Sequence, residues 1–271
     1  MQLILKERHI LNSSKILTSN STKKKGKEPI ISNFWPISLL TSFSKIFEKV
    51  IYDRLYDHIT NNNILSQEQF GFRKNLSTDT ASSNLINSIL LAFNNKITVG
   101  GIFCDLTKAF DSVNHSILLS KLEHSCITDN AFRRIKSYLD DRHHRVLIKN
   151  AQSVNHFSYW NKIKLGIPQG SILGPLLFLL YINDMPGYIN NLCPSNNLYK
   201  ITLFADDTSI IFARPNYTEF ENEFNKLFSN ITRWFQTNSP SLNFNKTHFL
   251  GRKNPQHTFL RRGNKAVGPM S

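Results

Sequence analysis

Two adjacent aspartates, Asp206 and Asp207, lie between two short runs of β-prone residues, 199–204 and 208–213. Runs rich in Ile, Leu, Phe and Thr are typical of strands, and Asp is common in the tight turn of a hairpin. A solvated turn is therefore the simplest interpretation of the pair. The alternative is a rigid hairpin that presents both carboxylates to a hard divalent cation such as Mg²⁺. A third carboxylate elsewhere in the chain would favour this second interpretation.

Asp105 is the candidate for that third carboxylate, because it directly follows a strand predicted over 97–104. A carboxylate at the end of a buried strand is costly unless it has a partner. If the strands lie side by side in one sheet, all three carboxylates gather at one edge, where divalent ions would relieve their repulsion. Two such ions could activate an attacking 3′-hydroxyl and stabilise a leaving pyrophosphate.

The composition favours a polyanionic partner. Of 271 residues, 33 are Lys or Arg and 19 are Asp or Glu, which gives a net charge of +14. Lys and Arg that contact phosphates release condensed counterions and so favour binding to nucleic acid. A basic solvated surface without such a partner is the alternative.

The sequence indicates an intracellular protein, in the cytoplasm, the nucleus or both, with no membrane partner. Its cysteines, Cys104, Cys126 and Cys193, lack the spacing of a metal site and are typical of reduced thiols. No signal peptide is expected, since charged residues at 6–8 interrupt the segment that would form its apolar core. The longest apolar run, 172–182, is too short to span a bilayer.

Three stretches show the periodicity of amphipathic helices. From Ser42 to Leu55 apolar residues recur three and four apart, and the solvent side is predicted to carry Lys45, Glu48, Lys49 and Arg54. A second helix begins at Asp79 or Thr80, and its apolar residues are Leu85, Ile86, Ile89, Leu90 and Phe93. A third stripe, from Phe220 to Phe235, is interpreted as core rather than as a platform for stacking bases.

A turn rich in Gly and Pro, 166–175, precedes a strongly apolar run that ends at Ile182. Such a turn leaves backbone N–H groups free, and glycine lets a base, sugar or phosphate approach closely. An N-capped core helix is the alternative, and it is preferred for 176–182. The adjacent His143 and His144 are expected to be solvated rather than to bind a metal.

At these same positions the sequence resembles the reverse transcriptases of non-LTR retrotransposons, and it is most similar to jockey-like elements. The resemblance rests first on the motifs at 204–207, 105–111 and 166–175. It extends to four further stretches: 33–40, 44–49, 69–73 and 242–247. The stretches follow the family's order from about residue 28 to about residue 250, which makes a chance match improbable.

The resemblance implies an α+β fold with a polymerase palm, which is an antiparallel sheet with packed helices, and mostly helical fingers. It divides the chain into a basic flexible lead-in (1–28), a fingers and palm domain (29–250) and a basic tail (251–271) that is expected to be disordered. The chain ends about where the family's thumb begins, so the thumb is expected to be absent. A fragment of this kind is expected to have low activity or none.

The implied activity is RNA-directed DNA polymerisation on an RNA template and a DNA primer, with dNTPs as substrates. Asp105 and Asp206 would hold two Mg²⁺ ions, with Mn²⁺ as the alternative, and Asp207 would lie beside them. Lys246 would lie near the leaving pyrophosphate as a proton donor. The sequence indicates no oligomeric state.

Four further residues would bind substrate by the same resemblance. Phe110 would be a steric gate that excludes a 2′-hydroxyl and so selects deoxynucleotides. Gln169 and Gly170 would line the incoming nucleotide and the templating base. Arg73 would contact the triphosphate, because its permanently charged fork suits phosphate.

Two positions depart from the family pattern: Trp35 replaces the usual Arg, and Pro240 replaces an apolar residue. A catalytically inactive nucleic-acid-binding remnant is therefore one alternative to an active polymerase. An RNA-dependent RNA polymerase is the other. Phe110 and Ala205 argue against the RNA polymerase, since viral relatives typically have Gly before the Asp pair.

Overall fold

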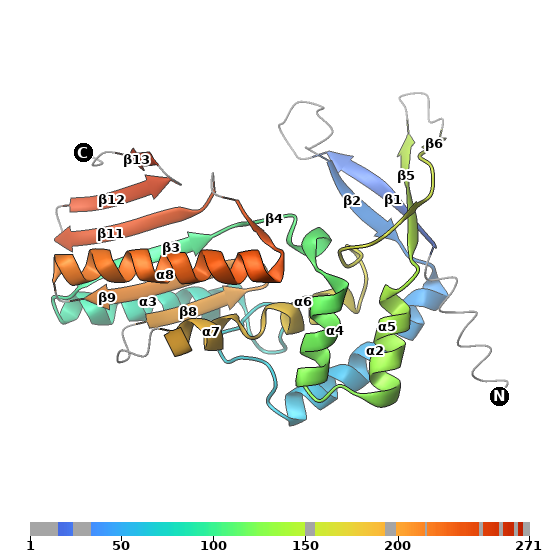
Figure 1. Cartoon of the computed structure of the whole chain (residues 1–271), viewed down its shortest axis with the longest axis horizontal. Helices are drawn as coiled ribbons and strands as arrows, with labels where there is room; N and C mark the ends of the chain where they lie inside the picture. The colour runs from blue at the N-terminus through green and yellow to red at the C-terminus, as the bar shows by residue number, and fades with distance from the viewer. Residues whose placement is uncertain are drawn as a thin grey trace. The chain divides into compact units, whose positions relative to one another are not determined.

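The computed structural model describes residues 16–23, 34–149, 155–192, 199–214, 216–243, 246–254, 257–262 and 265–267. The chain divides into two compact units. Unit 1 comprises Met1–Ile64 and Val113–Tyr181, and unit 2 comprises Leu65–Ser112 and Ile182–Ser271. Both contain helices and sheets with mostly antiparallel pairing, which confirms the predicted α+β class (Figure 1).

Unit 2 is built on an antiparallel sheet. Within the described residues its six strands have the order β13-β12-β11-β3-β9-β8. Their bounds are Thr98–Cys104 for β3, Tyr199–Phe204 for β8, Asp207–Arg214 for β9, His248–Asn254 for β11, His257–Arg262 for β12 and Lys265–Val267 for β13. The strands β8 and β9 form the predicted hairpin, and β3 pairs with both β9 and β11. The strand that ends before Asp105 therefore lies beside the hairpin that carries the aspartate pair.

Two helices cover opposite faces of this sheet (Figure 1). On one face, the ring of Phe212 in β9 stacks on Phe220 of α8 (Tyr217–Asn238), with centroids 4.8 Å apart. On the other, Ile211 of β9 and Leu91 of α3 (Thr78–Asn94) line a common small cavity. Successive strand residues point to opposite faces, so each helix buries one side of the sheet. The apolar stripe of α8 is core, as predicted.

Gly100 in β3 is required by the approach of α8. A Cβ atom at this position would lie 2.5 Å from Phe212 Cζ and 2.6 Å from Phe220 Cε2. Real Cβ contacts of this length do not occur, because the atoms would overlap. A glycine that weakens a strand by itself thus lets the helix pack directly on the sheet.

Shorter elements complete unit 2. These are β4 (Leu106–Thr107), the 3₁₀ turn η2 (Ala109–Ser112), α7 (Met185–Leu192) and β10 (Ser241–Leu242). The strands β12 and β13 lie within 251–271, the segment assigned to the basic tail. The pairing uses backbone groups: the edge of β11 offers N–H and C=O groups to any extended segment, whatever its side-chain pattern.

Unit 1 has a mixed sheet in the order β2-β1-β5-β6, with β7 paired to β5 in the described part. The bounds are Ile16–Lys23 for β1, Phe34–Leu39 for β2, His143–Lys149 for β5, Asn155–Phe157 for β6 and Asn161–Lys162 for β7. The lead-in thus contributes strand β1, whereas the basic run 24–27 lies outside the described residues. His143 and His144 begin β5, and no metal-binding group of side chains occurs among the described residues.

The helices of unit 1 are α2 (Ser42–Asn61), α4 (His115–His124), α5 (Asp129–Leu139) and α6 (Gly174–Ile182). Every side chain from Leu176 to Ile182 is at most 3% exposed, so this part of α6 is the predicted core helix. It is too short to span a bilayer, and no other helix in the described ranges combines the length and apolarity that a membrane span needs. Cys104 is buried and Cys126 is exposed; Cys193 lies outside the described residues.

The buried face of α2 differs from the one predicted. Phe43 is 71% exposed and Ile46 63%, whereas Glu48, predicted to face solvent, is only 1% exposed. The residues that face inward are Ser44, Glu48, Ile51, Leu55, Tyr56 and Ile59. The prediction for Glu48 was wrong because hydrogen-bond partners from distant segments compensate the burial of its charge. Similarly, Ile86 and Leu90 of α3 are about half exposed, although the periodicity predicts an apolar face there.

Candidate active site

Asp105, Asp206 and Asp207 meet at one end of the unit 2 sheet. Antiparallel pairing places Cys104 of β3 opposite Thr208 of β9, so Asp105 follows β3 where Asp207 begins β9. Phe204 pairs with Asp207 across the hairpin, which leaves Ala205 and Asp206 in a two-residue turn. Sheet register thus brings together carboxylates that are far apart in the sequence.

The carboxyl groups are close enough to influence one another electrostatically. Burial raises the pKa of Asp206 above its ordinary value, and the charge of Asp105 raises it further. The surrounding chain likewise raises the pKa of Asp207 by displacing water, and the charges of Asp206 and Asp105 add to that effect. Lys246 lowers the pKa of both groups but does not cancel the rise. The three carboxylates therefore repel one another electrostatically, and a bound cation would reduce that repulsion.

Lys246 forms an ion pair with Asp105. Its Nζ lies 3.2 Å from Asp105 Oδ2 and 3.4 Å from Oδ1. The backbone fixes this pairing, because the N–H of Asn243 donates to the carbonyl of Asp105 at 2.8 Å and the N–H of Lys246 donates to Asn243 at 2.9 Å. Pairing of β10 with β4 holds the same segment, and residues 244–245 lie outside the described part.

The donor set suits a hard divalent cation, since it consists of carboxylate oxygens without thiolate or imidazole. Within the described residues, no group of three His, Cys, Asp or Glu side chains is gathered into a ligand set. The aspartates thus interact through their charges, while the ammonium of Lys246 lies against Asp105.

The loop at 68–71 holds the β8–β9 hairpin that carries Asp206. Gln69 is 1% exposed, and its Oε1 accepts the N–H of Gly71 at 2.7 Å and that of Ala205 at 3.1 Å. The backbone continues the contact, because Phe70 N–H donates to Leu203 and Leu203 N–H donates to Glu68, both at 2.8 Å. Gln69 is therefore a structural support for the turn that carries Asp206.

Ala205 shows why the turn needs support. Its φ is 55°, in the left-handed region that residues with a Cβ atom rarely adopt. The loop also packs on it directly: a Cβ atom at Gly71 would overlap the backbone nitrogen of Ala205. The glycine between the two aromatic residues is thus explained by contact between two backbones.

Two predicted substrate residues belong to the same unit. Arg73 Nη1 donates to the carbonyls of Ser66 at 2.9 Å and Gln69 at 3.2 Å, so the guanidinium braces its own loop. The ring of Phe110, in η2, meets Phe72 edge to face, with centroids 6.3 Å apart and an interplanar angle of 83°. The contact sets the orientation of the Phe110 ring, which is partly exposed.

Gln169 and Gly170 lie in unit 1, in the turn before α6. Gly170 has a φ of 97° and is exposed. The carbonyl of Gln169 accepts the N–H of Ser38 at 2.9 Å. Ser171 Oγ donates to Pro168 at 2.9 Å and accepts the N–H of Gly174 at 2.9 Å, which caps α6. The turn is therefore fixed on both sides of the predicted nucleotide-binding pair.

Glu48 of α2 is a further support that sequence reasoning missed. Its Oε2 accepts the N–H of Ile172 at 2.7 Å and that of Leu173 at 3.5 Å. Its Oε1 accepts the hydroxyl of Tyr138 at 2.8 Å, and burial raises the pKa of that phenol. The guanidinium of Arg142 lies 4.4 Å from the Tyr138 ring. A carboxylate buried in α2 thus anchors the Gly- and Pro-rich turn.

Comparison with known families identifies the chain. Residues 22–260 match the family described as reverse transcriptase (RNA-dependent DNA polymerase). The chain belongs to this family. Reverse transcriptases use divalent metal ions, which agrees with the carboxylate chemistry of the site.

Relatives come from mobile elements of flies. The chain is 33% identical over 220 residues to the probable RNA-directed DNA polymerase from transposon BS of Drosophila melanogaster, covering 78% of the chain and 23% of that protein. It is 30% identical over 226 residues to the polymerase from mobile element jockey of Drosophila funebris, covering 82% of the chain and 24% of that protein. These matches confirm the jockey-like, non-LTR resemblance. The chain spans about a quarter of the length of these relatives.

Solved structures of telomerase share the fold. Telomerase from Candida albicans, in complex with a TWJ fragment of telomeric RNA, superposes with a TM-score of 0.63 at 12% identity, covering 96% of this chain and 45% of that one. Apo telomerase from Candida tropicalis, truncated from the C-terminal domain, gives 0.62 at 14% identity, covering 94% and 55%. The likeness confirms the predicted polymerase palm.

Proposed function

We propose that this chain catalyses RNA-directed DNA polymerisation, adding dNTPs to the 3′-hydroxyl of a DNA primer on an RNA template. The observation that carries the proposal is the meeting of Asp105, Asp206 and Asp207 at the end of β3 and the β8–β9 turn. Membership of the reverse transcriptase family supports the same reaction. The net charge of +14 suits a nucleic acid partner.

Asp105 and Asp206 would hold two Mg²⁺ ions, or Mn²⁺ in their place, with Asp207 beside them. Bound there, the ions supply Lewis acidity at the attacking hydroxyl and neutralise charge on the pyrophosphate. Lys246, whose ammonium lies against Asp105, would donate a proton to the pyrophosphate oxygen as that group leaves. Gln69 keeps the turn of Asp206 rigid by holding Ala205.

The remaining residues would position the nucleotide. Phe110, oriented by Phe72, would lie under the sugar and exclude a 2′-hydroxyl. Arg73 would place its guanidinium, already braced by two carbonyls, beside the triphosphate. Gln169 and Gly170 would line the base pair, because a glycine with a φ of 97° presents no side chain to it.

Primer extension on poly(rA)/oligo(dT) with Mg²⁺ tests this function. Asp206→Asn is expected to reduce extension by more than about 100-fold, beyond the 10–100-fold typical of residues that only support a metal ligand. Asp53→Asn is the matched control, since Asp53 is an exposed residue of α2 that pairs with Lys49. Extension that survives Asp206→Asn would refute the metal assignment.

A second candidate is nucleic acid binding without catalysis. The ion pair of Lys246 with Asp105 favours it, because the ammonium already neutralises a carboxylate that would otherwise bind a metal ion. Among the described residues, no group of three metal-ligating side chains is gathered together. Binding of the poly(rA)/oligo(dT) duplex without extension, in both Mg²⁺ and Mn²⁺, would select this candidate over the first.

A further inference from the structure

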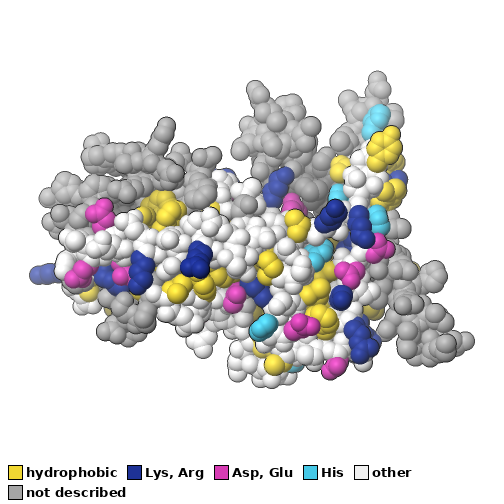
Figure 2. Space-filling model, viewed as in Figure 1, with side chains coloured by type: hydrophobic (Ala, Val, Ile, Leu, Met, Phe, Trp, Pro, Cys, Tyr) yellow, Lys and Arg dark blue, Asp and Glu magenta, His cyan; other side chains and the backbone are white. Residues whose placement is uncertain are grey.

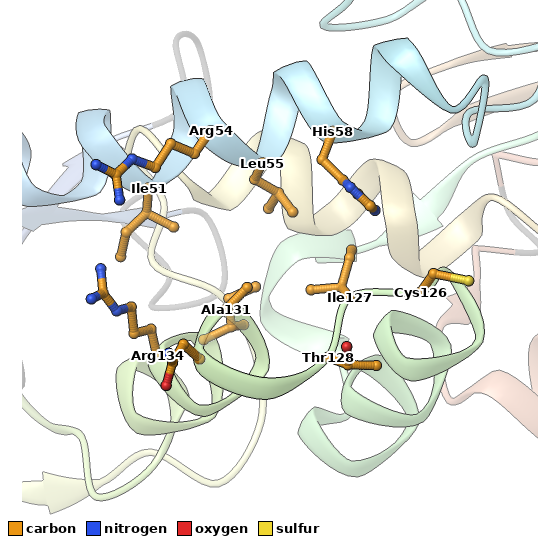
Figure 3. A pocket seen from close by; sticks show the side chains of 11 residues that line it. Ile51, Arg54, Leu55, His58, Cys126, Ile127, Thr128, Ala131 and Arg134 are labelled. Atoms are coloured by element: carbon orange, nitrogen blue, oxygen red, sulfur yellow. The ribbon is translucent and has the colours of Figure 1, made fainter.

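Unit 1 contains a cavity of about 400 Å³ that none of the proposed polymerase residues line. Its walls come from α2, from the turn before α5 and from the first turns of α5 itself (Figure 3). A volume of this size is within the range of pockets that hold small ligands. The side chains around it decide which ligand chemistry fits.

One end of the pocket is strongly cationic. Arg54 extends into it from α2 and Arg134 from α5, and Figure 3 shows both guanidinium groups at the same end. None of the described lining residues is acidic. Within the described part of the chain, Arg54 makes no hydrogen bond or ion pair. An anion bound between the two guanidinium groups would be attracted to both.

Arg134 is one of three basic residues that lie close together in the sequence of α5. Figure 2 shows Lys and Arg side chains along the surface of α5, where Arg133, Arg134 and Lys136 follow closely in the sequence. Of these only Arg134 lines the pocket. Planar guanidinium forks bind phosphate oxygens in pairs, which gives the pocket end a geometric preference for phosphate.

His58 supplies a further polar group that lines the pocket. His58 points toward the turn at Cys126 and Ile127, and its Nε2 is shielded from solvent without a hydrogen-bond partner in the described residues. Its Nδ1 lies 3.4 Å from Asn62 Nδ2, so Nε2 is the ring atom left for a ligand. A buried, unsatisfied ring nitrogen is costly, and a ligand oxygen would satisfy it.

The floor of the pocket is apolar. Ile51 and Leu55 of α2 and Ile127 and Ile135 from the α5 side are buried there, at most 9% exposed. Aliphatic side chains provide a surface for the flat face of a base, whereas inorganic phosphate alone would leave that surface wet. The combination of a cationic end with an apolar floor matches a nucleotide.

We propose that this pocket binds a phosphate-bearing ligand of mononucleotide size, with the phosphate between Arg54 and Arg134 and the base on the aliphatic floor. Two sources supply this chemistry: a free nucleoside monophosphate, or the 5′-phosphorylated end of a nucleic acid strand. The site shares no residue with the proposed polymerase site, so either assignment stands without the other.

Calorimetric titration of the whole chain with adenosine monophosphate, without divalent metal, tests the proposal. Each of Arg54→Gln and Arg134→Gln is expected to weaken binding by about tenfold or more, the size of one lost charge-assisted hydrogen bond. Arg133→Gln is the matched control, because Arg133 is exposed on the same helix and loses the same charge. Adenosine without phosphate is expected to bind at least about tenfold more weakly than the monophosphate.

Two outcomes would overturn the proposal: no binding of adenosine monophosphate by the intact chain at millimolar concentration, or an equal loss in Arg133→Gln, which would mean unspecific charge. Because the two test arginines lie on different helices, a folding defect in one variant leaves the other informative. Circular dichroism identifies such a defect.

The source of the phosphate is separated with two RNA oligonucleotides that differ only in a 5′-phosphate or 5′-hydroxyl. Fluorescence anisotropy with a 3′ label measures their binding. A preference for the 5′-phosphate that disappears in Arg54→Gln and persists in Arg133→Gln assigns a strand end. Equal binding of the two strands, together with Arg54-dependent binding of the monophosphate, assigns a free nucleotide.

Discussion

Two turns, one in each unit, are held by a single buried polar side chain, but the chemistry of the two supports differs. In unit 2 the neutral amide of Gln69 holds the turn before Asp206 through the N–H groups of Gly71 and Ala205. In unit 1 the carboxylate of Glu48 holds the turn before α6 through Ile172 and Leu173. Both are 1% exposed.

The local charge explains the difference. The turn of unit 2 already carries Asp206 and Asp207, and a buried carboxylate at position 69 would add to the repulsion that raises their pKa values. The turn of unit 1 has no acidic residue from Gly166 to Pro175, and Arg142 lies close to Tyr138, the other partner of Glu48. An anion is therefore tolerated as a support in unit 1, and a neutral amide suits unit 2.

Removing the charge of Glu48 is expected to have the largest effect on stability. Glu48→Gln replaces one acceptor oxygen by an amide group that cannot accept the N–H of Ile172 or the hydroxyl of Tyr138. The free energy of unfolding is expected to fall by about 3 kcal/mol, as for other broken buried charged networks. Urea denaturation followed by circular dichroism measures it. Glu123→Gln, an exposed position on α4, should change it by less than about 0.5 kcal/mol. Equal effects would show that Glu48 is not a specific anchor.

Gly71→Ala tests the backbone contact in unit 2. The new Cβ atom meets the backbone of Ala205, which cannot move without shifting the turn that carries Asp206. A loss of about 2–3 kcal/mol is expected, typical of overpacking, together with slower primer extension. Gly187→Ala is the matched control, since a Cβ atom there meets nothing within 4 Å and Gly187 lies in α7. That change should stabilise the protein by about 0.5–1 kcal/mol. A neutral Gly71→Ala would refute the close contact.

Gln69→Leu separates the amide from the shape of the side chain. Two buried N–H groups lose their acceptor, and a loss of about 2 kcal/mol in unfolding free energy is expected. If the amide positions Asp206, the Mg²⁺ concentration needed for half-maximal extension should rise, which general destabilisation would not cause. Gln67→Leu, an exposed neighbour, is the control. An unchanged Mg²⁺ dependence would mean that Gln69 supports the fold alone.

Asp206→Asn is expected to have the smallest effect on stability, and in the opposite direction. Because the folded state raises the pKa of Asp206, it binds this proton more tightly than the unfolded state does. The stability of the parent protein therefore falls as the pH rises from the ordinary pKa of Asp through the raised pKa of Asp206 in the folded state. The variant cannot titrate at this position and has no such loss. Without divalent metal, the Tm of the variant should be slightly higher at pH 7, and the difference should vanish below the ordinary pKa of Asp.

Addition of Mg²⁺ tests whether the stability difference between the parent protein and Asp206→Asn depends on a bound metal ion. An ion that binds the folded state raises its stability, so Mg²⁺ should raise the Tm of the parent more than that of Asp206→Asn. A Tm of the parent that does not respond to Mg²⁺ would contradict the proposed metal site.

Much of the fold could be predicted from the sequence. The hairpin around Asp206 follows from two β-prone runs, and the buried stripe of α8 and the apolar run of α6 follow from local periodicity. Family motifs led to Asp105, Asp206, Asp207 and Lys246, which the structure brings to one end of the unit 2 sheet. Periodicity failed for α2 and α3, where Phe43, Ile46, Ile86 and Leu90 are exposed. An amphipathic pattern predicts a helix but does not determine which neighbours will cover each face.

The sequence by itself determined residue chemistry and local conformation: which segments are strands, where turns occur, and which side chains are carboxylates. Only the tertiary structure decided which distant groups share one charge environment. Sheet register placed Asp105 beside the hairpin, and chain packing buried Glu48 and Gln69 against N–H groups that lie 124 and 136 positions away. The physical reason is that a buried polar group is stable only when its partner is present, and the partner of each of these side chains comes from a distant part of the chain.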